Sequence, residues 1–133
     1  MQYMLDTHTC IYLSRKSSPK VLARVSRYSP GDLVISTVTY GELRFGAEKS
    51  VHPGTGLKIL DEFTQTVPVV ALDKQVGESY GKLRLYLQRK GQIIGNNDLW
   101  IASHCLHLGL TLVTNNEREF KRIPNLPIEN WTH

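Results

Sequence analysis

Cysteine is scarce in this sequence, and long apolar runs are missing. Only two of the 133 residues are cysteine. Cys10 and Cys105 form no CxxC motif and have no Cys or His at a zinc-ligand spacing, so a zinc site is disfavoured. No apolar run approaches the roughly 18 residues of a membrane span, and Asp6 interrupts the N-terminal stretch where a signal peptide needs an apolar core. We therefore expect buried structural thiols and a cytoplasmic protein that does not enter the membrane.

Low-complexity tracts, internal repeats and linker-like segments are also missing. The chain is 41% hydrophobic and 21% charged, which is the composition of an ordinary globular protein. We therefore expect a single domain over residues 1–133. Sixteen Lys and Arg against twelve Asp and Glu give a net charge of +4, which permits nucleic-acid binding but indicates it only weakly.

Short apolar runs alternate with longer amphipathic segments along the chain. The runs predict strands at 3–5, 33–36, 67–72 and 111–114, with a small last strand beginning at Ile128. Pro68 places the third strand near a sheet edge. The amphipathic segments predict helices at 10–13, 19–28, 37–50, 55–64, 74–90 and 97–108. This alternation predicts an α/β fold, in which a central twisted parallel sheet of four to five strands is flanked by helices on both faces.

Acidic side chains occur where the predicted strands end or the next helix begins. Asp6 follows the first strand, Glu42 lies just after the second, and Asn116 and Glu119 follow the fourth. Asp98 falls in the first turn of the helix that precedes the fourth strand. Because ligand sites in parallel sheets form outside the carboxyl ends of the strands, we expect these side chains to meet in one cleft.

Each of these residues also has a purely structural explanation. Asp6 could cap a helix, Asp98 could favour a helix N-terminus through the helix dipole, and Glu119 could be a solvated surface charge. Two pairs have the three-residue spacing of a capping box, namely Thr39 with Glu42 and Thr114 with Glu117. A residue that caps a helix can also bind a metal ion. The joint occurrence of these acids at strand and helix ends is therefore more informative about function than any one of them.

Gathered carboxylates need a cation. Two of them about 4 Å apart repel by roughly 4 kcal/mol at an effective dielectric constant near 20. Oxygen ligands without sulfur or imidazole select hard ions such as Mg²⁺ or Mn²⁺, and His8 is the only histidine in these segments. An ion of this kind can activate water and neutralise a phosphodiester.

Four segments and the C-terminus resemble a known family. The segments MLDT (4–7), STVTYGEL (36–43), IGNNDLWIA (94–102) and LVTNNEREF (112–120) resemble the signature segments of PIN-domain ribonucleases, most closely those of VapC-type toxins. The closing IPNLPIENW (123–131) resembles the usual VapC C-terminus. The likeness covers nearly the whole chain, in order and with family-like spacing.

The resemblance implies a PIN-like fold and an endoribonuclease that depends on Mg²⁺, with Mn²⁺ substituting for it. It implies RNA hydrolysis by water that the ion activates, which leaves 5′-phosphate and 3′-hydroxyl ends. It also implies a homodimer of bacterial origin and a VapB-type antitoxin whose C-terminal segment occupies the cleft. Relatives of this type cut tRNA, so the anticodon loop of initiator tRNA is the expected target.

Residue by residue, the resemblance assigns Asp6 and Asp98 as the main metal ligands. Glu42 would complete the acidic cluster, directly or through water, and Thr7 would be the hydroxyl that positions it.

At the fourth position this chain has Asn116 where many PIN domains have Asp. Asn supplies no charge, so Glu119, one helical turn on, is expected to take that catalytic part. His8 stands where related toxins often have Asn. A folded RNA also needs a basic surface, for which the long predicted helix offers Lys82, Arg84, Arg89 and Lys90.

Two other functions are compatible with parts of this pattern. A non-catalytic PIN-type domain that binds RNA or protein would explain Asn116, although the other acids are retained. A receiver-like phosphoacceptor domain also gathers acids at strand ends, but it needs an adjacent acidic pair after the first strand. Asp6 stands alone there, which disfavours the second alternative.

Overall fold

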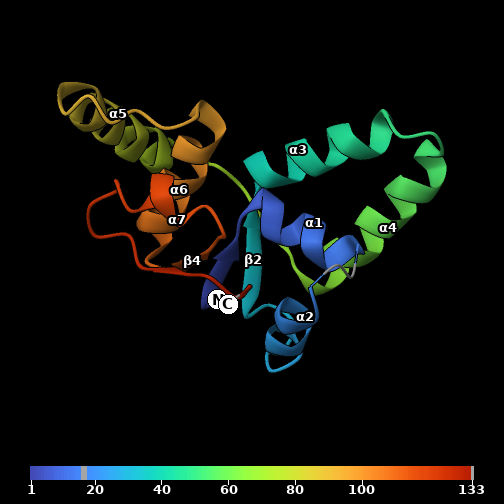
Figure 1. The fold of residues 1–133 in the computed structure, drawn as a ribbon. Coiled ribbons are helices and arrows are strands. Elements are labelled where there is room, and N and C mark those ends of the chain that lie inside the picture. Colours follow the sequence, from blue (N-terminus) through green and yellow to red (C-terminus); the bar gives the residue numbers. More distant parts are fainter. Residues whose placement is uncertain (16–17, 133) are drawn as a thin grey trace.

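A five-stranded parallel sheet forms the centre of the molecule (Figure 1). The computed structural model describes residues 1–15 and 18–132. The strand order is β3-β2-β1-β4-β5 and every neighbouring pair is parallel, which confirms the predicted sheet. The strands are β1 (Tyr3–Leu5), β2 (Leu33–Ser36), β3 (Val69–Val70), β4 (Thr111–Val113) and β5 (Ile128–Glu129).

Helices surround this sheet. Those in the described part of the chain are α1 (Thr7–Arg15), α2 (Pro19–Val25), α3 (Thr37–Glu48), α4 (Pro53–Thr66), α5 (Lys74–Arg89), α6 (Asn96–Leu108) and α7 (Glu117–Phe120). Figure 1 shows α5, α6 and α7 on one side of the molecule and α1 to α4 on the other. None of the helices formed by residues 1–15 and 18–132 has both the length and the apolar character needed to cross a membrane.

Alternation along the strands creates a separate core on each face of the sheet. Met4 packs with buried residues of α5 and α6, whereas its neighbour Leu5 packs with residues of α1 and α2. Successive side chains of a strand point to opposite faces, so one short strand serves both cores. The two cysteines are divided in the same way: Cys105 lies in the first core and Cys10 in the second, both as buried free thiols. Helices on both faces, as predicted, are therefore confirmed.

Helix ends follow local signals. The Asp73 carboxylate accepts a hydrogen bond of 3.0 Å from the Val76 N–H and begins α5. Gly109 ends α6 at φ +68°, a left-handed conformation that costs glycine little.

Several predicted boundaries differ from the structure, and one short helix was not predicted. Helix α1 begins at Thr7 and not at Cys10, and α2 ends at Val25 and not at residue 28. Strand β3 keeps only two of its six predicted residues, at the expected sheet edge, because Val67 still belongs to the end of α4 and Pro68 has no N–H to donate. Helix α7 was not predicted, since four residues are too few to show a helical period.

Helix α5 offers a matched test of this packing. Leu87 is 1% exposed in the core, whereas Leu85 on the same helix is 46% exposed. Leu87→Ala should lower the free energy of unfolding by about 2–5 kcal/mol, and Leu85→Ala should change it by less than about 0.5 kcal/mol. Urea unfolding followed by circular dichroism measures both. Equal losses in the two variants would contradict the packing described here.

Candidate active site

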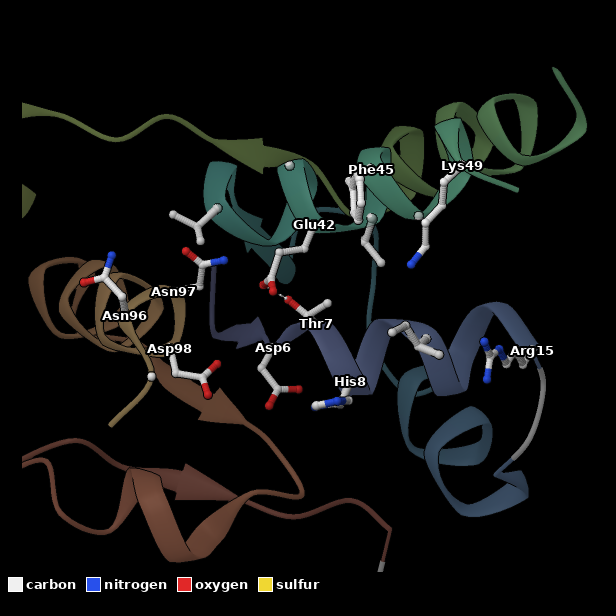
Figure 2. Close-up of a pocket in the computed structure, with 16 residues that line it drawn as sticks. Asp6, Thr7, His8, Arg15, Glu42, Phe45, Lys49, Asn96, Asn97 and Asp98 are labelled. Atoms are coloured by element: carbon white, nitrogen blue, oxygen red, sulfur yellow. Dashed lines mark hydrogen bonds between the residues drawn. The ribbon is translucent and has the colours of Figure 1, made fainter. Parts of the chain in front are cut away.

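A groove of 1220 Å³ opens at the carboxyl end of β1, and its walls come from α1, α3 and the start of α6 (Figure 2). The groove is lined by four of the predicted site residues, Asp6, Thr7, Glu42 and Asp98. Six others do not line it, namely Asn116, Glu119, Lys82, Arg84, Arg89 and Lys90. The convergence predicted from the strand ends therefore holds for the three acids from β1, α3 and α6.

Asp6 is fixed at the end of β1 by its own backbone and by α1. Its N–H donates to the Val113 carbonyl of β4 at 3.0 Å, and its Oδ1 accepts from the Thr9 N–H at 2.9 Å. The residue is only 3% exposed. Asp6 thus caps α1, as one of the alternatives held, and still lines the groove with the rest of its carboxylate.

Glu42 is oriented from the facing helix. The Thr7 hydroxyl donates to Glu42 Oε1 at 2.6 Å and lies 3.4 Å from the Thr39 hydroxyl. The capping box suggested for Thr39 and Glu42 is wrong, because α3 begins two residues earlier and Ser36 caps it by accepting from the Val38 N–H. The Glu42 carboxylate is therefore not used as a cap and faces Thr7. This is the orientation that the predicted contact with the Thr7 hydroxyl requires.

Among the acids of the groove, Asp98 has a perturbed pKa. Burial, followed by the negative charges of Asp6, Glu119 and Glu42, raises its pKa to about 6. His8, an exposed residue of the groove wall, acts in the opposite direction. Figure 2 shows the Asp6 and Asp98 carboxylates pointing into the same space. The neighbouring acids are thus close enough to disfavour the ionisation of Asp98.

The first turn of α6 is held by a neighbouring helix and not by a side-chain cap. Gly95 is the N-cap, and no side-chain hydrogen bond from the described residues caps the helix. The Asn96 oxygen instead accepts a hydrogen bond from the Tyr80 hydroxyl of α5. The first turn of α6 is therefore held against α5 while Asp98 faces the groove.

Asn116 and Glu119 form a pair beside the groove. The Asn116 amide donates to Glu119 Oε2 at 3.0 Å, and the Asn116 N–H donates to the Thr114 hydroxyl at 2.9 Å. The capping box suggested for Thr114 and Glu117 is therefore wrong, because Asn116 is the N-cap of α7. Glu119 lies outside the groove wall but close enough to Asp98 to raise its pKa.

The donor set fits a hydrated hard cation. Within residues 1–15 and 18–132, no group of three or more His, Cys, Asp and Glu side chains lies close enough to enclose an ion. Two carboxylates that share one space, with waters completing the shell, suit Mg²⁺, which usually keeps several waters. The raised pKa of Asp98 is an independent reason to expect a cation here. A bound cation would favour the ionised carboxylate and offset the repulsion from the neighbouring acids.

A buried pair behind the site was missed from the sequence. His104 Nδ1 lies 2.8 Å from the Ser36 hydroxyl, and both residues are fully buried. Burial lowers the pKa of His104, so a neutral imidazole links α6 to the cap of α3. The available signal was His104 itself, one of two histidines inside the apolar run that follows Asp98.

Two cations of the groove were also missed. Arg15 and Lys49 line the end of the groove that lies away from the acids (Figure 2). Both are exposed and belong to helix ends, so their sequence context resembles ordinary surface charge. The groove is thus negative at one end and positive at the other.

The Asp98 carboxylate predicts a pH-dependent change in stability. Its pKa is higher in the folded protein, about 6 against an ordinary 3.8, so ionisation costs stability that is fully lost above pH 6 and regained as the pH falls toward 4. Asp98→Asn should therefore raise the free energy of unfolding by about 1–2 kcal/mol at pH 8, after allowance for solvent screening, and by much less at pH 4. Thermal unfolding with a chelator present measures this. Asp61→Asn, at an exposed position of α4, is the control, and a gain at Asp98 that is independent of pH would contradict the prediction.

The family model for the PIN domain matches residues 3–126. Ribonuclease VapC1 of Haemophilus influenzae (strain R2866) is 44% identical, with 99% of each chain covered. The tRNA(fMet)-specific endonuclease VapC of Salmonella typhimurium is 39% identical, with 98% of each chain covered.

A solved structure has the same fold over the full length. The structure of VapBC-1 from nontypeable Haemophilus influenzae superposes with a TM-score of 0.92 and 41% identity, with all of each chain covered. The PIN-like α/β fold predicted from the sequence is confirmed. The receiver-like alternative is wrong. From the matched family model and the full-length relatives, the chain belongs to the PIN-domain family and, within it, to the VapC ribonucleases of toxin–antitoxin systems.

Proposed function

We propose that this protein is the toxin of a toxin–antitoxin pair and acts as a metal-dependent endoribonuclease. The observation that carries the proposal is the convergence of Asp6, Glu42 and Asp98 on one groove, with the pKa of Asp98 raised by burial and by the other acids. A cluster of acids in which one carboxylate is kept from ionising by burial and by its neighbours is typical of a functional site such as a metal-ion site. Such a cluster does not stabilise the fold. The ribonuclease names of the full-length relatives support the same activity.

Asp6 and Asp98 would hold the ion. Asp6 is already immobilised through its Oδ1 by the Thr9 N–H, so its position costs no further ordering when a ligand arrives. When bound, Mg²⁺ or Mn²⁺ would supply a lowered water pKa and charge neutralisation at the phosphodiester.

Glu42 and Glu119 would support this pair from two sides. Thr7 fixes Glu42 through Oε1, which leaves Oε2 able to accept a proton from water in the groove. Asn116 fixes Glu119 through Oε2. We propose that Glu119 supplies the negative charge that Asn116 lacks, since it acts on Asp98.

The substrate we propose is RNA, with the anticodon loop of initiator tRNA as the first candidate. Two relatives are named tRNA(fMet)-specific endonucleases, at 39% and 36% identity. Arg15 and Lys49 at the positive end of the groove suit phosphates next to the cleaved bond. The basic residues Lys82, Arg89 and Lys90 are exposed on α5 and would contact the RNA outside the groove. The proposed cytoplasmic location fits this substrate, because tRNA is used there in translation.

The partners we propose are a VapB-type antitoxin and a second copy of the chain. The neighbouring solved structures are titled as VapBC complexes, some of them with bound DNA. The antitoxin would occupy the groove with a C-terminal segment and so block the acids. We further propose that the chain works as one domain, since all five strands lie in one sheet.

Cleavage of RNA tests the activity directly. The purified protein in Mg²⁺ should cut initiator tRNA in total bacterial RNA into discrete fragments with 5′-phosphate and 3′-hydroxyl ends. EDTA or Asp98→Asn should remove these fragments, since each removes part of the ion site. Cyclic phosphate ends would refute the proposed hydrolysis. RNA binding without cleavage in either Mg²⁺ or Mn²⁺ would instead favour a non-catalytic PIN domain, with Asn116 as its cause.

The Thr7 hydroxyl should support the activity chiefly by orienting Glu42, to which it makes its shorter hydrogen bond. Thr7→Val keeps the shape but removes the donor to Glu42 Oε1, and it should lower kcat/KM by about 10–100-fold, as is usual when a support of a metal-site carboxylate is lost. Thr7→Ser should restore most of the activity, because it returns the hydroxyl. Thr55→Val, at an exposed position of α4, controls for the loss of a threonine. Activity equal to wild type in Thr7→Val would show that this contact is not needed.

A further inference from the structure

A second, smaller cavity lies beside the groove and shares one residue with it. Its volume is 230 Å³, and Asn96 lines both spaces. Its apolar walls include Leu87, Ile94 and Leu99, which are all buried. Ile93 at its edge is 58% exposed. The cavity is therefore an apolar slot that opens to solvent next to the acids.

Gln88, Arg84 and Asn96 are the polar residues that line this cavity, and one hydroxyl holds two of them, Arg84 and Asn96, in place. Tyr80 donates its hydroxyl hydrogen to the Asn96 oxygen and accepts from Arg84 Nη1, which lies 3.0 Å away. Because the Asn96 oxygen is used, the amide presents its two N–H groups, for which residues 1–15 and 18–132 show no acceptor. Arg84 is exposed and offers further donors. The two groups that Tyr80 holds therefore offer donors to a ligand.

The Tyr80 ring is itself immobilised. It stacks on Trp100 of α6 with ring centroids 3.7 Å apart and an angle of 8° between the planes. This stacking couples the long helix α5 to the same first turn of α6 that carries Asp98. The start of α6, held against α5 by this stacking, therefore joins the cavity to the acidic groove. The position of the cavity relative to the acids is fixed.

We propose that this cavity binds one unpaired nucleobase of the RNA substrate and prefers bases with carbonyl acceptors, guanine or uracil. This inference rests on the proposed ribonuclease function. The cavity is smaller than the roughly 300–1,000 Å³ of sites for drug-sized ligands, so it suits one planar ring system. Apolar walls fit the faces of a base, and an arginine beside an amide donor fits its carbonyl edge. Basic residues on the same helix, Lys82, Arg89 and Lys90, match the charge of the flanking phosphates.

Binding without cleavage tests the proposal. The probe is a fluorescent hairpin with the sequence of the anticodon arm of initiator tRNA, together with versions in which each loop base in turn is removed. Fluorescence anisotropy in EDTA gives the Kd of each. Loss of the base that the cavity holds should weaken binding about 5- to 150-fold, the range for one good bidentate contact to a base. At that position guanine or uracil should bind more tightly than adenine.

Matched arginine variants connect that position to the cavity. Arg84→Met and Arg89→Met remove the same charge from the same helix, but only Arg84 lines the cavity. Arg84→Met should abolish most of the preference among bases, whereas Arg89→Met should weaken all hairpins alike and keep the preference. Tyr80→Phe keeps the ring but frees Arg84 and Asn96, and it should also reduce the preference. Thermal unfolding checks that each variant remains folded.

The outcomes separate this inference from the nuclease proposal. Equal affinity for every version of the hairpin, or no binding of any, would overturn the nucleobase site. Equal affinity for every version would instead favour a side chain of a protein partner as the occupant of the cavity. A preference that survives Arg84→Met would overturn it as well. Base-dependent binding without cleavage in Mg²⁺ or Mn²⁺ would keep the base site and refute the nuclease.

Discussion

Repulsion among carboxylates at one end of a parallel sheet is the constraint on which this structure depends. Asp6, Glu42 and Asp98 come from three separate segments and share one groove. The cost appears at Asp98, whose pKa is raised to about 6. A fold that only needed stability would separate these charges or pair them with cations. The chain instead places Arg15 and Lys49 at the far end of the groove, where they do not neutralise the acids.

Short-range hydrogen bonds keep the acids in place without neutralising them. Asp6 accepts from the N–H of Thr9, and Glu42 accepts from the hydroxyl of Thr7. These donors carry no formal charge, so they orient the carboxylates while leaving the repulsion for a cation to relieve. The buried contact between His104 and Ser36 extends the support to the cap of α3. The site is therefore organised by neutral polar groups.

Sequence periodicity predicted the sheet and its layers because β1, β2 and β4 are compact apolar runs that end at or just before a polar residue. The position of Asp6 after Leu5 is visible in this way. The predictions that failed concern which of several nearby polar side chains caps a helix. The spacing of Thr39 and Glu42 fits a capping box, but Ser36 lies nearer the strand end and caps first. The Asn96 side chain could have capped α6, but it bonds Tyr80 of another helix. Such choices depend on tertiary neighbours, which spacing does not encode.

The first turn of α6 connects chemistry and recognition. Successive helical residues rotate by about 100°, so residues two apart point to nearly opposite sides of the helix. Asp98 can therefore face the acids while the Asn96 oxygen accepts a hydrogen bond from Tyr80 of α5. The stacking of Tyr80 on Trp100 fixes that turn against α5. A base held beside Asn96 would then set the phosphate that reaches Asp98, because both contacts belong to one rigid turn. Specificity and cleavage would thus be linked by geometry, without a moving part.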